Sequence, residues 1–380
     1  MAETDAALDA FRKGIADWIE AACPASLRGR PMTEDMIVWG GRRWEFKDPA
    51  QKAWLDAATE RGMTAPRWPV EYGGAGLSRA QEKIYREEMA RLQAPPPLES
   101  FGLWMLGPAL LAFGNEEQKK RHLPPITRGE IRWCQGYSEP GAGSDLANVQ
   151  TRAEDMGDHY LLNGAKLWIS NSPFADIAIV WAKNEEGRIH GLIVERGMEG
   201  FSTPETHNKW SLRASATGEL IFDNVKVPKE NLLPGKNGLG APLGCLDSAR
   251  YGIAWGAIGA AMDCYDTALR YAKERTQFGK PIAAFQLQQK KLAEMITEIT
   301  KAQLLAFRLG QLKNEGRATT AQISMAKRNN VDMALKIARE ARQILGGMGI
   351  TGEYSIMRHM MNLESVITYE GTHDIHLLIT

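Results

Sequence analysis

A cluster of polar residues lies near the end of the sequence, in the stretch ITYEGTHDIH at 367–376. Glu370 stands beside Gly371 there, between the apolar segments ESVITY and IHLLIT. A carboxylate with apolar neighbours loses hydration, which raises its pKa and makes it a better base near neutral pH. A single Glu is more often a solvated surface charge. No metal-ligand cluster accompanies the carboxylate, so the residue chemistry alone goes no further than an acid–base enzyme with a nucleotide-like cofactor.

A glycine-rich stretch, YSEPGAGSD at 137–145, is the second candidate. Gly141 and Gly143 allow positive φ and let the backbone approach a ligand closely. The hydroxyls of Ser138 and Ser144 suit phosphate oxygens or the polar edge of a ring. The same pattern also occurs in simple turns. The sequence has no GxGxxG after a strand and no P-loop lysine motif, which disfavours a nicotinamide site and a nucleoside triphosphate site.

Three further stretches have both a ligand-binding and a structural interpretation. In KLWISNSP (166–173), Trp168 and Ser170 could cover a flat ring and address its heteroatoms, although a Trp is more often a core residue. In KERTQFGKP (273–281), the guanidinium of Arg275 matches phosphate oxygens, or else is a charged helix end. QILGGMGI (343–350) either brings backbone to a ligand or ends a helix.

The elements that must position these residues change type along the chain. Residues 1–130 read as helices broken by turns, residues 131–237 as short strands, and residues 238–380 as long helices. The strands HYLLNGAKLWIS, DIAIVWAK, IHGLIVERG and GELIFDNVKVP are not interleaved with helices. We therefore expect an α+β fold in three domains, with an antiparallel sheet or small barrel in the middle.

Composition excludes several classes of protein. The 46 basic and 46 acidic residues cancel, so no net field favours nucleic acid. No segment of the sequence offers about 18 uninterrupted apolar residues, so we expect no membrane-spanning helix. The four cysteines form no CxxC pair, which suits a reducing compartment. The start MAETDAALDA carries no evident signal or transit peptide, so the bacterial cytoplasm, or the mitochondrial matrix in a eukaryote, is the expected location.

Taken together, YSEPGAGSD, LWISN, RTQFGKP…FQ and QILGGMGI followed by YEGTHDIH resemble the acyl-CoA dehydrogenase family over the whole chain. The resemblance implies a helical N-terminal domain, a middle β domain and a C-terminal four-helix bundle. It implies a homotetrameric FAD flavoprotein that oxidises an acyl-CoA and passes electrons to electron-transfer flavoprotein. Relatives usually continue beyond the position of Thr380, so weaker flavin retention is expected. The rival readings are a flavin oxidase on the same fold and a flavin-free scaffold paralogue.

The resemblance also assigns roles to residues. Glu370 corresponds to the base that removes the α-proton of the thioester while the β-hydrogen leaves as hydride to flavin N5, giving a trans-2-enoyl-CoA. Some relatives carry the base at the position of Ala249, which closes that option here. The implied cofactor contacts are Gln135, Ser138, Gly143, Ser144, Trp168, Ile169, Ser170, Arg275, Phe278, Gln286, Gln343, Gly346, Gly347, Thr372 and Asp374. The implied substrate contacts are Ser144, Asp247, Arg250, Tyr369 and Gly371.

The two ends of the chain resemble different relatives. The C-terminal two thirds resemble glutaryl-CoA dehydrogenases, whereas the N-terminal third is closer to general bacterial acyl-CoA dehydrogenases. Glutaryl enzymes hold the distal carboxylate with an Arg in the N-terminal domain, but Pro96–Ser100 contains no Arg, and Glu99 would repel that carboxylate. An unpaired buried carboxylate costs several kcal/mol. The apolar stretch FGLWMLGPALL therefore predicts an uncharged acyl chain, with oxidative decarboxylation of glutaryl-CoA to crotonyl-CoA as the alternative.

Overall fold

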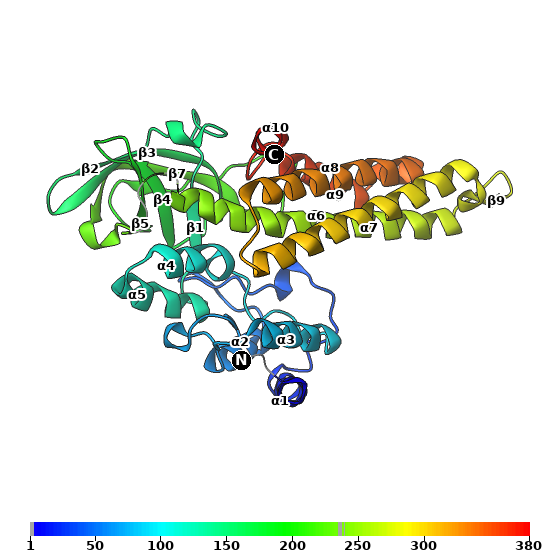
Figure 1. Ribbon diagram of the computed structural model, residues 1–380, viewed down its shortest axis with the longest axis horizontal. Coiled ribbons are helices and arrows are strands. Elements are labelled where there is room, and N and C mark those ends of the chain that lie inside the picture. The colour runs from blue at the N-terminus through cyan, green and yellow to red at the C-terminus, as the bar shows by residue number, and fades with distance from the viewer. Residues whose placement is uncertain (1–3, 235–237, 239) are drawn as a thin grey trace. The chain divides into compact units, whose positions relative to one another are not determined.

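The computed structural model describes residues 4–234, 238 and 240–380, which form two compact units (Figure 1). The first unit contains Met1–Thr206 and Ala216–Ala241, and the second contains His207–Ser215 and Pro242–Thr380. The change from helix to strand falls between Thr127, the end of the fifth helix, and Trp133, the start of the first strand. The predicted boundary at residue 237 lies outside the described residues. The division into three domains stays a prediction.

The first unit begins with helices whose ends the sequence marks clearly. Ser78 and Gln81 form a reciprocal capping box at the start of one helix, and Asn115 and Gln118 do the same at another. The sequence predicts helices broken by turns for residues 1–130, and the structure has helices there. The helices are α1 (Asp5–Ala22), α2 (Pro49–Glu60), α3 (Arg79–Arg91), α4 (Gly107–Phe113) and α5 (Glu116–Thr127), with a π-helical turn at Gly102–Leu106 before α4.

The middle of the chain forms one seven-stranded sheet in the order β1-β4-β2-β3-β7-β6, with β5 paired to β4. All four predicted strands are present, and the sheet is mostly antiparallel. Two pairings differ from the expectation of an antiparallel sheet. Strand β1 runs parallel to β4, with Trp133 opposite Ile177, because the β2–β3 hairpin lies between them in sequence and allows a crossover. Strand β2 also runs parallel to β4, with Arg152 opposite Lys183. The strands are β1 (Trp133–Gly136), β2 (Arg152–Asp155), β3 (His159–Ser170), β4 (Ile177–Lys183), β5 (Ile189–Glu195), β6 (Phe201–Ser202) and β7 (Thr217–Pro228).

The second unit is a bundle of long helices joined by a small hairpin (Figure 1). Thr319 and Gln322 form a capping box at the start of one long helix, which ends before Gly346, as the glycine pair predicts. The elements are α6 (Gly240–Glu274), β8 (Thr276–Gln277), β9 (Lys280–Pro281), α7 (Gln286–Asn314), α8 (Thr320–Ile344), α9 (Ile356–Val366) and α10 (His373–Ile379).

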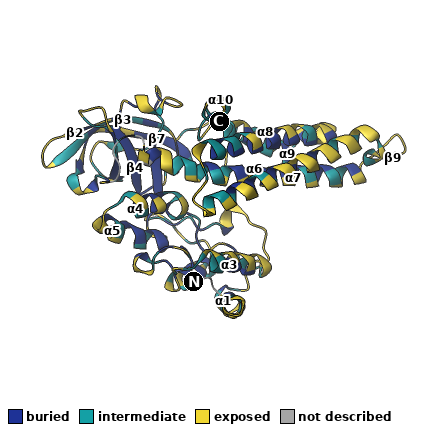
Figure 2. Ribbon diagram, viewed as in Figure 1, coloured by how far each residue is buried: buried dark blue, intermediate teal, exposed yellow. Residues whose placement is uncertain are grey.

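Alanines are frequent where these long helices pack together. Ala261, Ala268, Ala306, Ala334 and Ala338 are fully buried in one continuous core drawn from α6, α7, α8 and α9. Short side chains let helix axes approach closely, which holds the bundle rigid. In the sheet, β4 is buried along almost its whole length (Figure 2). None of the helices in the described parts of the chain is long and apolar enough to cross a membrane.

Candidate active site

Glu370 lies in a tight turn, residues 367–372, between α9 and α10. Helix α9 closes with hydrogen bonds from the amides of Ile367 and Tyr369 to the carbonyls of Leu363 and Ser365 (3.0 Å each). The chain then takes two left-handed conformations in succession, with φ of 54° at Glu370 and 97° at Gly371. A non-glycine residue with positive φ is uncommon and stores strain. The surroundings must therefore hold this turn, and two buried cations do so.

The first cation is Arg250 of α6. Its Nε donates to the carbonyl oxygen of Glu370 at 2.8 Å, and its Nη1 lies 3.1 Å from a carboxyl oxygen of Asp247, one helical turn earlier. The other Asp247 oxygen accepts from the hydroxyl of Thr320, the first residue of α8, at 2.7 Å. The predicted substrate contacts Asp247 and Arg250 are thus joined to the Glu370 turn, and the network ties α6, α8 and the turn together.

The second cation is Lys327 of α8, which is fully buried. Its Nζ donates to three carbonyl oxygens, those of Val366 at 2.8 Å, Tyr369 at 2.9 Å and Gly371 at 2.9 Å. An ammonium group has three protons, and here each has a carbonyl partner. Val366 is the last residue of α9, where the helix dipole is negative and favours a cation. Together the two cations bind four carbonyls of Val366–Gly371.

One oxygen of the Glu370 carboxyl group is buried, although the residue as a whole is partly accessible. Its Oε2 is buried and has no hydrogen-bond partner among the described residues. Burial raises the pKa of Glu370 to about 7, against an opposing effect of Arg250 and Lys327. The raised pKa predicted from the apolar neighbours is confirmed. Burial likewise lowers the pKa of Lys327 to about 8, while Glu370 counteracts this and Arg250 reinforces it.

His376 fills the space behind the turn. It is fully buried on α10, where its ring lies against the backbone of the Glu370 turn. Burial lowers its pKa to about 4, helped by the positive charges of Lys327 and Arg250. A Cβ on Gly371 would come within 2.8 Å of His376 Nε2, so the ring requires glycine at that position.

The remaining predicted residues of this region lie close by on α10 and in the turn. Thr372 is the N-cap of α10 and its hydroxyl accepts from the amide of Ile375 at 3.2 Å. Asp374 is exposed in the first turn of α10. The Tyr369 ring faces Lys327, whose Nζ lies 5.8 Å from the ring centroid, and burial raises the Tyr369 pKa to about 12.

In the first unit, a buried ion pair fixes the two predicted ring-binding segments. Lys166 Nζ lies 2.8 Å from Glu139 Oε1 and 3.1 Å from the carbonyl of Tyr137. The amide of Leu167 donates to the carbonyl of Ser138 at 2.8 Å. Strand β3 and the start of YSEPGAGSD are therefore held side by side. Gln135 lies on β1, where its Nε2 donates to the Tyr137 hydroxyl at 2.9 Å and its Oε1 is buried without a partner among the described residues.

Trp168 is not a core residue. Its side chain is exposed (60% of the residue), and its φ is 63° within a break in the β3–β7 register between Lys166 and Ile169. Such a bulge re-aims a side chain that would otherwise alternate into the sheet. The neighbouring Ile169 is buried and Ser170 is half-buried. The core interpretation of Trp168 is therefore wrong, while the ring-covering interpretation is untested.

Gly141 and Gly143 do not adopt the positive φ that their residue type allows. The turn therefore does not need glycine for its conformation. A Cβ at either position would meet no atom within 4 Å, because this segment is exposed. Ser144 beside them is exposed as well. Their remaining explanation is close approach of a ligand, which is a proposal.

The other predicted cofactor residues lie away from Glu370 within the second unit. Arg275 and Phe278 are exposed on the β8–β9 hairpin, at the end of the bundle opposite α10 (Figure 1), and Phe278 is 92% exposed with a φ of 54°. Gln286 is exposed at the first residue of α7. Gln343, Gly346 and Gly347 are exposed at the end of α8, where Gln343 Oε1 accepts from Lys291 Nζ at 2.7 Å. A single bundle does not bring these residues to Glu370.

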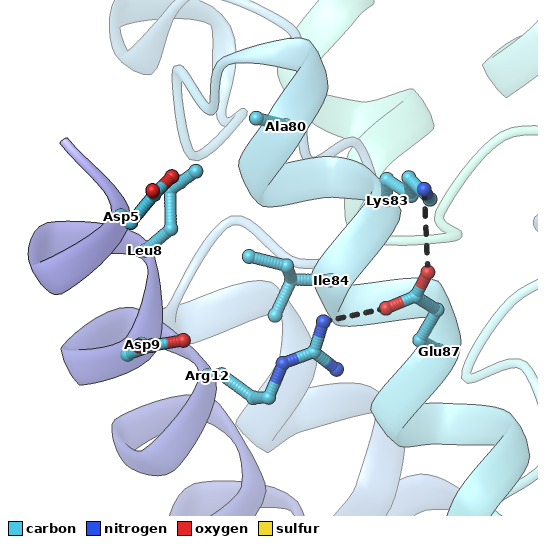
Figure 3. Close-up of a pocket in the computed structure, with 8 residues that line it drawn as sticks. All are labelled: Asp5, Leu8, Asp9, Arg12, Ala80, Lys83, Ile84 and Glu87. Atoms are coloured by element: carbon cyan, nitrogen blue, oxygen red, sulfur yellow. Dashed lines mark hydrogen bonds and ion pairs between the residues drawn. The ribbon is translucent and has the colours of Figure 1, made fainter. Parts of the chain in front are cut away.

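A surface pocket lies between α1 and α3 (Figure 3), far in sequence from any predicted site residue. Both of its cations pair with the same carboxylate: Arg12 Nη2 is 2.6 Å from Glu87 Oε2, and Lys83 Nζ is 3.7 Å from Glu87 Oε1. The lining contains none of the predicted site residues, and we assign it no role.

Sequence reasoning missed Lys327, His376, Lys166 and Thr320. A signal for Lys327 was available, since it falls on the apolar face of α8 between the buried residues Ile323 and Val331. A charged residue at a buried helical position must have partners. No comparable signal marks Thr320, because its partner Asp247 is 73 residues away in sequence.

Comparison with known proteins matches this chain along most of its length. Residues 30–130, 134–225 and 236–380 match the N-terminal, middle and C-terminal domains described for acyl-CoA dehydrogenases. Glutaryl-CoA dehydrogenase of Desulfococcus multivorans is 38% identical over 84% of this chain and 85% of its own length. The short-chain-specific acyl-CoA dehydrogenase of Megasphaera elsdenii is 36% identical over 88% and 90%.

A solved structure gives the same result for the fold. The crystal structure of a glutaryl-CoA dehydrogenase from Mycobacterium smegmatis in complex with FADH2 is 37% identical, with a TM-score of 0.76, covering 100% of this chain and 94% of the other. The chain therefore belongs to the acyl-CoA dehydrogenase family. It is an enzyme of the flavin-dependent oxidoreductase class, and the α+β fold expected from the resemblance is confirmed.

Proposed function

We propose that this protein oxidises an acyl-CoA thioester to its trans-2-enoyl-CoA, with Glu370 as the base that takes the α-proton. The observation that carries the proposal is the Glu370 carboxyl itself, whose Oε2 is buried without a partner among the described residues and whose pKa is raised to about 7. A base with a pKa near the working pH is the most effective. The backbone N–H of Glu370 would donate to the thioester oxygen and stabilise the enolate-like charge.

We propose FAD as the cofactor, since it supplies the acceptor to which the β-hydrogen passes as hydride. The described residues fit a flat ring and a diphosphate. Trp168 is exposed by a bulge, Gln135 has a buried acceptor without a partner, and Gly143 leaves open space beside its backbone. The FADH2 complex of the Mycobacterium smegmatis relative supports the same cofactor. Ser138, Ile169 and Ser170 would hold the ring edge, and Thr372 and Asp374 would contact the cofactor beside the base.

We propose a homotetramer in which a neighbouring chain completes the cofactor site. Arg275, Phe278 and Gln286 lie at the far end of their own bundle from Glu370, which supports contact with the dinucleotide of another copy (Figure 1). Helix α7 carries exposed apolar side chains at Leu287, Ile296, Leu304 and Phe307, as expected of a helix covered by a partner. Gln343, Gly346 and Gly347 would take part in the same dinucleotide contact. Sedimentation equilibrium would test the assembly, and a monomeric holoenzyme would contradict it.

For the substrate, we propose an uncharged acyl chain. Burial raises the pKa of Glu99, and the charged group acting against this is Arg86. A second carboxylate beside a buried carboxyl gains no stabilising partner. In the apolar stretch, Leu106 and Leu110 are buried in the core of the first unit and Trp104 is half exposed. Glutaryl-CoA remains the alternative, because the matched relatives include both glutaryl and short-chain enzymes.

A dye-reduction screen of the holoenzyme tests this function. Butyryl-, isobutyryl-, octanoyl- and glutaryl-CoA are compared, with Glu370→Gln as the control for the base. We expect turnover of a monocarboxylic acyl-CoA and loss of about 1000-fold or more in the variant. Faster turnover of glutaryl-CoA, with release of carbon dioxide, would favour the alternative. Reduction of electron-transfer flavoprotein without oxygen uptake would distinguish a dehydrogenase from an oxidase, and a chain that binds no FAD would indicate a scaffold.

A further inference from the structure

The side chain of Lys327 makes its hydrogen bonds to the Glu370 turn, and α8 itself does not need these bonds. It lies in the interior of α8, seven residues after the first residue of that helix, where backbone groups bind one another within the helix. Its ammonium reaches out of the helix to the carbonyls of Val366, Tyr369 and Gly371. These carbonyls lie on both sides of the base, so the contact spans Glu370.

The turn needs such a contact. Glu370 and Gly371 both have positive φ, and a non-glycine residue keeps that conformation only where its surroundings over-determine it. Arg250 binds the carbonyl of Glu370 itself, while Lys327 binds the residues before and after it. Without Lys327, three carbonyls would lose their partner and the turn would be free to relax toward an ordinary conformation.

We propose that Lys327 is a positioning residue for the base: by binding the carbonyls on both sides of Glu370, it fixes the left-handed turn that holds the carboxyl in its reactive orientation, and its charge favours the ionised carboxylate. This inference rests on the proposed role of Glu370. Lys327 itself binds backbone carbonyls, and its proposed role does not require contact with the reacting atoms.

The charged and titratable groups around the turn come from each element packed against it. Arg250 and its partner Asp247 are on α6, Lys327 is on α8, Tyr369 is in the turn, and His373, Asp374 and His376 are on α10. Burial lowers the pKa of both histidines, so they add no positive charge near neutral pH. Loss of the Lys327 charge should therefore raise the pKa of Glu370, leaving Arg250 as the remaining cation.

The test uses two variants and two controls on the same helix. Lys327→Met removes the charge and all three donors, and Lys327→Gln keeps an N–H donor on a shorter, neutral side chain. Lys336→Met changes an exposed lysine that pairs with Asp332. Asn330→Ala removes a buried hydrogen bond to the carbonyl of Ala254, at 3.1 Å, and so controls for a general loss of stability in α8.

The measurements are kcat and KM of the FAD-loaded enzyme, their pH profiles, and amide hydrogen exchange of residues 367–371. For Lys327→Met we expect kcat to fall about 10- to 100-fold with little change in KM. The acid limb of kcat should move up by about 1 pH unit. Exchange in residues 367–371 should become faster in this variant and stay at the wild-type rate in both controls. Lys327→Gln should recover part of kcat but keep the shifted limb.

The inference would be overturned if folded Lys327→Met kept a kcat within about twofold of wild type and an acid limb within about 0.2 pH units of wild type. An equal fall in kcat for Asn330→Ala would also overturn it, because the effect would then be general stability. If Lys327→Met fails to fold, Lys327→Gln and its hydrogen exchange decide by the same criteria. Full turnover by Glu370→Gln would instead refute the proposed function, which separates the two failures.

Discussion

Arg250 binds the main chain of Glu370, with its Nε 2.8 Å from the carbonyl oxygen of that residue. The side-chain carboxyl group of Glu370 keeps one oxygen, Oε2, without a hydrogen-bond partner among the described residues. A guanidinium paired with the carboxylate would hold its pKa low and weaken it as a base. By binding the carbonyl, Arg250 fixes the residue while leaving the carboxyl available.

Arg250→Lys should reduce kcat by about tenfold or more, although the charge is kept. An ammonium cannot reproduce the planar fork that reaches both the Glu370 carbonyl and Asp247. Steady-state kinetics with the best acyl-CoA measures this. Arg317→Lys, at an exposed pair with Glu315, is the matched control and should leave kcat unchanged. Equal activity of both variants would contradict the anchoring role.

The pH dependence of kcat/KM should have an acid limb near pH 7. The base must be ionised to accept a proton, and burial raises the pKa of Glu370 to about 7. Activity therefore rises as the pH increases through 7, falling about tenfold for each pH unit below it. A profile that stays flat from about pH 5.5 to 8 would show that the base titrates elsewhere.

Glu370→Gln should stabilise the protein at alkaline pH. The folded pKa of about 7 lies above the ordinary 4.5, so the native state binds the proton more tightly than the unfolded state does. The cost of ionising the buried carboxyl then appears between pH 4.5 and 7 and is complete above 7. Urea unfolding should show a gain on the order of 1–3 kcal/mol at pH 8 and little at pH 4.5. A gain that is larger at acid pH would contradict the assignment.

The helices and strands were predictable from the local sequence pattern, whereas the strand pairing and the hydrogen-bond networks were not. The strand HYLLNGAKLWIS corresponds to β3 residue for residue, and the glycine pair after Ile344 marks the end of α8. Apolar period and turn residues are local properties, so the sequence carries them directly. The parallel pairing of β1 with β4 depends on segments about 40 residues apart, and periodicity has no information on it.

The candidate site divides in the same way. The apolar neighbours of Glu370 sufficed to predict a raised pKa. The left-handed φ of Glu370, and the carbonyls that Lys327 and Arg250 bind, depend on α6 and α8 meeting the turn between α9 and α10. Trp168 is the reverse case, because local pattern left the core and the ring-covering interpretations open, and a bulge that no local pattern marks turns its side chain outward.

Gly371→Ala should both destabilise the protein and slow turnover. Its φ is 97°, and the added Cβ would come within 2.8 Å of His376 Nε2 and 3.4 Å of Arg250 Nη2. Strain of this kind costs about 1–3 kcal/mol, and displacement of the neighbouring Glu370 should lower kcat by about tenfold or more. Thermal unfolding and steady-state kinetics measure the two effects. Gly14→Ala is the control, since Gly14 is exposed within α1 and its Cβ would meet no atom within 4 Å.

The buried pair of Lys166 and Glu139 should show strong coupling in a double-mutant cycle. Lys166→Met leaves the Glu139 carboxylate buried with only amide donors, such as Thr151 N at 3.0 Å. Breaking a buried pair costs about 3–5 kcal/mol, whereas replacing both charges costs much less. Lys166→Met combined with Glu139→Gln should therefore be more stable to urea than Lys166→Met alone.

A surface pair provides the comparison for this cycle. Lys290 and Glu294 are 2.6 Å apart and exposed, so Lys290→Met should change stability by less than about 0.5 kcal/mol. FAD content of the purified variants adds a functional readout, because the pair holds Ser138 and Trp168 on adjacent segments. Lys166→Met should retain less FAD than Lys290→Met. The prediction would be contradicted if the stability changes of Lys166→Met and Glu139→Gln were additive in the double variant and all variants kept their full FAD content. The buried pair would then neither stabilise the sheet nor support the cofactor site.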